Sequence, residues 1–101
     1  MPEFVKVAAV SDLPPGKVAQ VAIGDRTIAL CNVDGTFYAL DNVCIHRGGP
    51  LGEGYLEGDK LECPWHAWQF NVKTGCLTAN PREKVPTFEV KVEGSDVLVA
   101  L

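Results

Sequence analysis

Cys44-Ile45-His46 and Cys63-Pro64-Trp65-His66 are the two motifs around which the rest of this chain is organised. Each motif offers one thiol and one imidazole, and sixteen residues separate the two. Both histidines of the protein lie in these motifs, together with two of its four cysteines. Thiolate and neutral imidazole are both good ligands for iron or zinc. The two motifs therefore predict a metal centre with two cysteine and two histidine ligands.

Two other interpretations use the same residues differently. Cys44 and Cys63 can form a disulfide in an oxidising compartment, but the N-terminal segment MPEFVKVAAV has no basic region leading into a long apolar stretch. We therefore expect a cytoplasmic protein. A zinc-stabilised interaction module is the stronger alternative. Zinc modules usually pair like with like, as C-x2-4-C followed by H-x3-5-H, whereas each motif here mixes the two ligand types.

The mixed pairs suit a two-iron, two-sulfide cluster in which two cysteines bind one iron and two histidines bind the other. C-x-H, sixteen residues and then C-P-x-H resemble the Rieske [2Fe–2S] proteins in ligand type, ligand order and spacing. The resemblance extends over residues 44–52 and 63–70, and the short chain is similar to the soluble Rieske-type ferredoxins in particular. It implies one [2Fe–2S] cluster per chain. The implied ligands are Cys44, His46, Cys63 and His66.

An electron carrier is the function that the resemblance implies. A cluster of this kind passes one electron at a time. The sequence offers no nucleophile–base pair, carboxylate dyad or further histidines for catalysis, so we expect no enzyme activity of its own. The resemblance implies transfer from an NAD(P)H-dependent flavoprotein reductase to a terminal oxygenase. The alternative within the family is the small Rieske subunit of an assimilatory nitrite reductase, whose partner is the large subunit.

Composition and hydrophobic patterning indicate one small all-β domain. The chain has 101 residues, 47% of them hydrophobic, and no apolar stretch approaches the length of a membrane span. A net charge of −4 argues against binding to nucleic acid or anionic membranes. No segment of ten or more residues has helical periodicity, and short strands recur at intervals of about 8–12 residues, as in antiparallel sandwiches and barrels. We therefore expect residues 1–101 to form a single domain.

Turn residues divide the chain into its expected strands. Asp34-Gly35 is a strong two-residue hairpin signal, and Gly58-Asp59 predicts a short hairpin that joins the two motifs. The resemblance implies the Rieske fold, an antiparallel β-sandwich or barrel base with a small cluster-binding subdomain inserted at about residues 43–69. Strands are expected at residues 4–10, 18–23, 26–33, 36–40, 55–57, 60–62, 68–72, 87–92 and 97–101.

Three apolar loop residues near the histidines are candidates for partner docking. Pro50, Leu51 and Trp65 are expected to stay partly exposed and to form the tip that meets the electron-transfer partners. Trp68 opens a strand, so we expect it in the core. Cys31 lies inside an apolar strand and is interpreted as a buried bystander rather than a ligand.

Departures from the respiratory branch of the family predict a low reduction potential. That branch has a serine and a tyrosine whose hydroxyls bond the cluster and a ligand sulfur, and the matching positions here are Trp68 and Phe70. Such hydrogen bonds stabilise the reduced state and raise the potential. The same branch ties its loops with a disulfide, whose cysteines are replaced here by Gly49 and Trp65. The expected potential is near the low end of the Rieske range, at about −150 mV.

Overall fold

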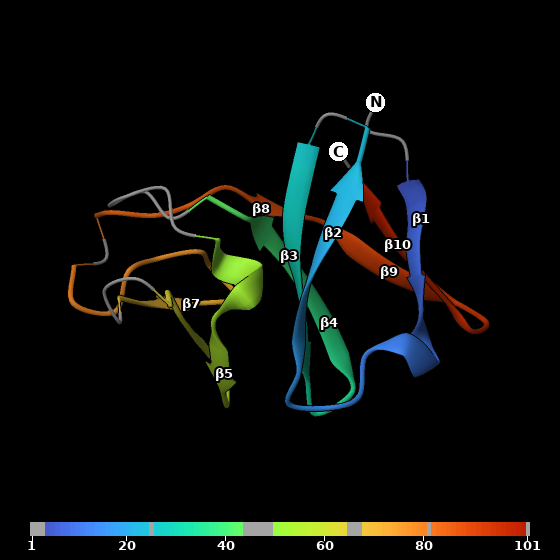
Figure 1. Cartoon of the computed structure of the whole chain (residues 1–101), viewed down its shortest axis with the longest axis horizontal. Helices are drawn as coiled ribbons and strands as arrows, with labels where there is room; N and C mark the ends of the chain where they lie inside the picture. Colours follow the sequence, from blue (N-terminus) through green and yellow to red (C-terminus); the bar gives the residue numbers. More distant parts are fainter. Residues whose placement is uncertain (1–3, 25, 44–49, 65–67, 81, 101) are drawn as a thin grey trace.

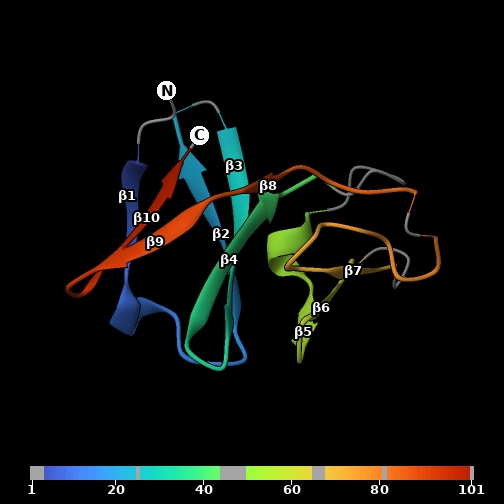
Figure 2. The ribbon, with the colours of Figure 1, turned by 180° about the vertical axis from the view of Figure 1, so that it is seen from behind.

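Three antiparallel sheets form the described part of the protein (Figure 1, Figure 2). The computed structural model describes residues 4–24, 26–43, 50–64, 68–80 and 82–100. The first sheet has the order β1 (Phe4–Ala9), β10 (Asp96–Ala100) and β9 (Val90–Glu93). The second has the order β2 (Val18–Ile23), β3 (Arg26–Val33), β4 (Thr36–Asp41) and β8 (Thr87–Phe88). The third has the order β5 (Tyr55–Glu57), β6 (Lys60–Glu62) and β7 (Gln69–Asn71). The described ranges also contain the single-turn 3₁₀ helices η1 (Val10–Asp12) and η2 (Leu51–Glu53). The all-β prediction is confirmed.

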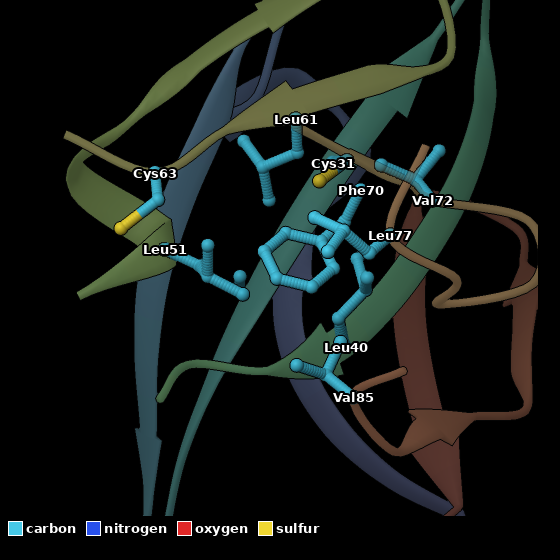
Figure 3. Close-up of a cluster of buried hydrophobic side chains, with 10 residues drawn as sticks. Cys31, Leu40, Leu51, Leu61, Cys63, Phe70, Val72, Leu77 and Val85 are labelled. Atoms are coloured by element: carbon cyan, nitrogen blue, oxygen red, sulfur yellow. The ribbon is translucent and has the colours of Figure 1, made fainter. Parts of the chain in front are cut away.

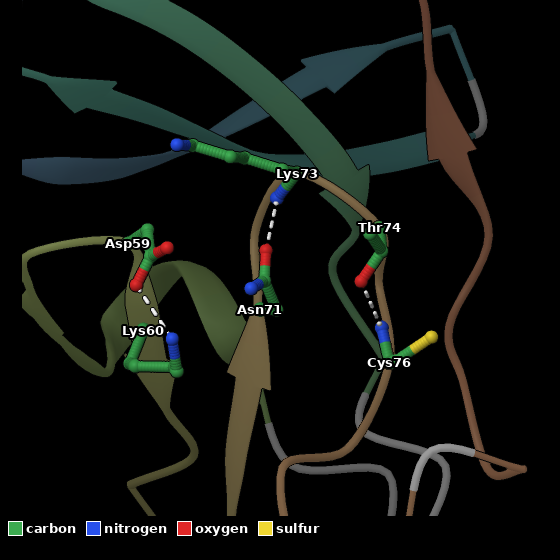
Figure 4. Close-up of polar contacts among 6 residues, drawn as sticks. All are labelled: Asp59, Lys60, Asn71, Lys73, Thr74 and Cys76. Carbon is green, nitrogen blue, oxygen red and sulfur yellow. Dashed lines mark hydrogen bonds and ion pairs between the residues drawn. The ribbon is translucent and has the colours of Figure 1, made fainter.

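The turn residues adopt the conformations that the sequence predicts. Asp34 and Gly35 both have positive φ, 51° and 94°, as a two-residue hairpin turn between antiparallel strands requires. Gly58, with φ of 60°, turns the chain between β5 and β6. Beside it, Lys60 Nζ lies 2.6 Å from Asp59 Oδ1, and this hydrogen bond lowers the pKa of Asp59 (Figure 4). The expected hairpin between the two motifs is confirmed.

β3 is buried on both faces because the second sheet lies between the other two. Successive side chains of a strand point to opposite faces. Ile28 and Leu30 belong to a core cluster shared with the first sheet, whereas Ala29 and Cys31 belong to a cluster shared with the third sheet. Residues 28–32 are therefore all buried, without the alternation of a strand that has one wet face.

The chain changes sheets within the segment where the sequence predicts one strand, residues 87–92. β8 pairs with β4 of the second sheet, and β9 pairs with β10 of the first. Glu89 lies between them, and its carbonyl accepts a hydrogen bond from Ala100 N–H at 2.9 Å. The prediction of a single strand is wrong, because the two halves of this extended segment find different partners.

The third sheet stands beside the other two in both ribbon views (Figure 1, Figure 2). η2 packs against β2 and β3, so it joins this sheet to the second one. The subdomain expected at about residues 43–69 contains β5, β6 and the start of β7, and the sheet continues to Asn71. Within the part of the chain that is described, no helix is long and apolar enough to cross a membrane.

Candidate metal centre

Cys63 is the predicted ligand that the structure places. It directly follows β6, is 1% exposed, and has a free thiol. Its backbone N–H donates a hydrogen bond to Trp68 O at 2.7 Å. That bond joins the first residue of the second motif to Trp68, which opens the strand after it, so the described residues on the two sides of residues 65–67 are held together beside the third sheet. The other three predicted ligands lie outside the described residues: Cys44, His46 and His66.

The first motif is closed at its base in the same way. Val43 and Pro50 form an antiparallel bridge, so the residues on either side of 44–49 pair with one another. Next to this bridge, Leu51 N–H donates to Asn42 O at 2.7 Å. The described residues on the two sides of the first motif are therefore paired with one another, as are those on the two sides of residues 65–67.

Leu51 and Cys63 bring the two loop bases together (Figure 3). Both are buried in the core cluster that also contains Leu61 and Phe70. Leu51 follows the base of the first motif, and Cys63 opens the second. Trp68, which we expected in the core, is half-buried against the same cluster. The fold therefore brings the bases of the two motifs, which are distant in sequence, to neighbouring positions.

The burial of Leu51 corrects its predicted role. We expected this side chain to be partly exposed, but it is 0% exposed and fills the space between the first loop base and the third sheet. Burial of a leucine side chain stabilises a fold by about 2 kcal/mol, which a docking role would forfeit. Of its proposed companions, Pro50 is half-buried and Trp65 lies outside the described residues. An exposed apolar residue that the sequence did not single out as a docking candidate is Val43, which is 53% exposed and directly precedes Cys44.

The two remaining cysteines are poorly placed to be ligands. Burial raises the pKa of the Cys31 thiol to about 12, so this group stays protonated near neutral pH, whereas metals bind the thiolate. Cys76 follows the turn after β7 (Figure 4), and its carbonyl accepts Asn71 N–H at 2.8 Å. It therefore lies at the opposite end of β7 from Trp68 and the second motif.

The residues present fit a two-iron cluster. The candidate ligand that the structure places, Cys63, is a free, buried thiol at the end of β6, and the motif sequences offer a second thiol and two imidazoles for the two irons. Nowhere in the ranges that the structure describes do three or more His, Cys, Asp or Glu side chains gather in a way that offers another metal site.

Comparison with known proteins agrees with this geometry. A family model described as the Rieske [2Fe-2S] domain matches residues 3–89. The chain therefore belongs to the Rieske [2Fe–2S] family, and it carries this cluster. Within the family it is a ferredoxin, a one-electron carrier rather than an enzyme, because its relatives are the ferredoxin components of dioxygenase systems.

Two curated relatives and one solved structure illustrate the similarity. The ferredoxin component of the naphthalene 1,2-dioxygenase system of Pseudomonas aeruginosa is 36% identical, over 98% of this chain and 96% of its own length. The ferredoxin component of biphenyl 2,3-dioxygenase from Rhodococcus jostii is 43% identical, over 97% and 92%. A chain in the complex of reduced oxygenase and oxidized ferredoxin in carbazole 1,9a-dioxygenase superposes with a TM-score of 0.87. It is 39% identical and covers 96% of this chain and 92% of its own.

The reduction potential is expected to be low, at about −150 mV. Phe70 is 0% exposed in the cluster of side chains that contains Cys63, and phenylalanine has no hydrogen-bond donor. No hydroxyl at this position therefore stabilises the reduced state. Protein-film voltammetry at neutral pH measures the value directly. A potential above roughly +100 mV, in the upper half of the Rieske range, would contradict this reasoning.

Phe70→Tyr tests the same cause. A hydroxyl added here is expected to raise the potential by donating a hydrogen bond to Cys63 Sγ or a neighbouring sulfide. Phe37→Tyr is the matched control, because Phe37 is also buried but belongs to the core cluster shared with the first sheet. Equal potentials in the wild type and both variants would mean that position 70 has no influence on the cluster.

Proposed function

We propose that this chain takes electrons from an NAD(P)H-dependent flavoprotein reductase and delivers them, one at a time, to a terminal oxygenase. The observation that carries the proposal is the meeting of the two closed loop bases at Leu51 and Cys63. Similarity over nearly the whole chain to ferredoxin components of dioxygenase systems supports the choice of an oxygenase as acceptor.

We assign the cluster to one thiol and one imidazole from each motif. The cysteines would hold one iron and the histidines the other, and the bound cluster supplies the one-electron chemistry. A histidine that binds iron through one ring nitrogen keeps the other free to face a partner protein. Because each motif would contribute a ligand to both irons, the separation of the two loop bases controls whether the cluster fits between the motifs. The proposed ligands are Cys44, His46, Cys63 and His66.

The surface beside the first motif is our proposed docking face. Val43 is exposed there and Pro50 is half-exposed, and Trp65 of the second motif is proposed to complete the face. Aromatic and apolar side chains with a polar rim are typical of protein interfaces. Arg26 and Asp41 are charged residues that lie next to Val43, since the three line one pocket. They can therefore supply the polar rim.

Electron transfer by the Trp65→Ala variant tests the docking face. The flavoprotein reductase and the terminal oxygenase are purified from the protein's host. We expect the reductase to reduce the variant at least about tenfold more slowly than the wild type, because central aromatic residues dominate many interfaces. Val92→Ala is the control, since Val92 is an exposed apolar residue of β9 in the first sheet. A wild-type rate for Trp65→Ala with a full cluster would count against this face.

The same preparation separates the alternative functions. A zinc-stabilised module would be colourless and would contain no sulfide. The small subunit of a nitrite reductase would copurify from its host with a tightly bound large subunit, whereas a free carrier would not. We further propose that residues 1–101 form a single domain with a cluster-binding subdomain at about 43–69. A cytoplasmic location completes the proposal, supported by the free thiols of Cys31, Cys63 and Cys76.

A further inference from the structure

Asn42 bonds to three segments that are distant in sequence. Its side chain is buried, its Oδ1 accepts a hydrogen bond from Gly52 N–H at 2.7 Å, and its Nδ2 donates to Gln20 Oε1 at 2.8 Å. Its backbone N–H donates to Thr27 O at 3.3 Å, and its carbonyl accepts Leu51 N–H at 2.7 Å. All four polar groups of this residue are therefore used, and together they join β2, β3 and η2.

η2 approaches β2 very closely at this point. A Cβ atom on Gly52 would overlap Gln20 Cγ and would lie 2.7 Å from Asn42 Oδ1. Because glycine has no side chain, its backbone N–H can reach the buried amide. Because the two elements are in such close contact, η2 can pack on β2 in only one position. The Asn42 amide holds it in that position through its hydrogen bond to Gly52.

Asn42 and its hydrogen-bond partners in η2 flank the first ligand motif in the sequence. Asn42 lies one residue before the bridge that closes residues 44–49, and Leu51 follows that bridge. Leu51 then enters the core cluster that contains Cys63, the ligand of the second motif. The amide that fixes η2 on β2 therefore also sets where the base of the first motif lies relative to Cys63, which opens the second.

We propose that Asn42 is a positioning residue for the [2Fe–2S] cluster. Its side-chain amide, held between Gln20 and Gly52, keeps the two motifs at a constant separation, so that the cluster is retained. This inference rests on the ligand set proposed above. Residues that orient metal ligands through hydrogen bonds commonly change metal affinity by about 10–100-fold when they are replaced.

Asn42→Ala in the cluster-loaded protein is the direct test. We expect iron release to an added chelator to be about tenfold faster than in the wild type, at the low end for residues that orient ligands. We also expect a broader EPR signal from the reduced cluster, because the two motifs are no longer held in one arrangement. Iron release is a property of the protein alone, so the test needs no partner enzyme.

Asn32→Ala is the matched control. Asn32 is equally buried, and it also accepts a hydrogen bond from a glycine N–H, that of Gly35, and donates one to a carbonyl, that of Leu13, both at 2.7 Å. It lies at the far end of β3 from Thr27. The control is expected to lower the midpoint of thermal unfolding about as much as Asn42→Ala, with iron release and EPR signal unchanged. Equal acceleration of iron release in both variants would overturn the positioning role.

Gln20→Ala keeps the test decisive if Asn42→Ala does not fold. Gln20 is exposed on β2, so its truncation removes the partner of Asn42 Nδ2 without opening the core. We expect iron release about threefold faster than in the wild type, as for the loss of one hydrogen bond.

Asn42→Asp keeps an acceptor for Gly52 N–H and is expected to restore part of the iron retention that Asn42→Ala loses. An unchanged rate in Gln20→Ala would overturn the inference, as would the absence of rescue by Asn42→Asp.

The cluster content of the wild type separates this inference from the function on which it rests. Wild-type protein without two irons and two sulfides per chain would overturn the proposed ligand set and the positioning role together. If the wild type holds the cluster and its Asn42 and Gln20 variants release iron at the wild-type rate, the positioning role alone is overturned.

Discussion

Replacement of any one predicted ligand is expected to leave the purified protein without its [2Fe–2S] cluster. Each iron would have two protein ligands, so the loss of one thiol or imidazole leaves that iron with a single protein ligand. Serine and alanine cannot replace the lost donor in this setting. The variants are Cys44→Ser, His46→Ala, Cys63→Ser and His66→Ala.

The two other cysteines provide the control for this prediction. Cys31→Ser and Cys76→Ser are expected to keep a full cluster, because one thiol is buried and protonated and the other lies at the far end of β7. Iron analysis, sulfide analysis and the visible spectrum of each purified variant are the measurements. A full complement of iron in any of the four ligand variants would show that the ligand set is wrong.

Gly54→Ala is expected to destabilise the protein by at least about 3 kcal/mol, the upper end for forcing extra atoms into a packed site. A Cβ atom at this position would overlap the carbonyl oxygen of Glu62 and would lie 3.1 Å from Leu51 O. Both neighbours are backbone atoms, so no side chain can rotate away. β5 and β6 would have to separate, and these strands connect the two motifs.

Thermal unfolding of the purified variant measures this effect. A loss of that size is expected to lower the midpoint by more than about 10 °C in a domain of this length. Gly58→Ala, in the same hairpin, is the control: its φ of 60° is unfavourable for alanine, but an added Cβ meets no atom within 4 Å. We expect it to cost about 1–2 kcal/mol. Equal midpoints for the two variants would show that the predicted overlap is relieved.

Much of the fold was predictable because turn chemistry is local. Asp34-Gly35 and Gly58 have the backbone conformations that their residue types favour, and the strands on either side of these turns match the expected ranges. The two motifs were recognisable for the same reason, since ligand type and spacing are properties of short segments. Confirmation of the family and its cofactor came from the comparisons. The assignment of each ligand stays a prediction.

The sequence by itself determined the class of fold, the cofactor chemistry and the positions of most strands. Only the tertiary structure decided that Leu51 is buried rather than exposed, that residues 87–92 divide between two sheets, and that Asn42 joins η2 to β2. The physical reason is that turns and ligand motifs depend on neighbouring residues. Burial, sheet membership and buried hydrogen bonds depend on which distant segments pack together, and no local pattern around Leu51 or Asn42 records those partners.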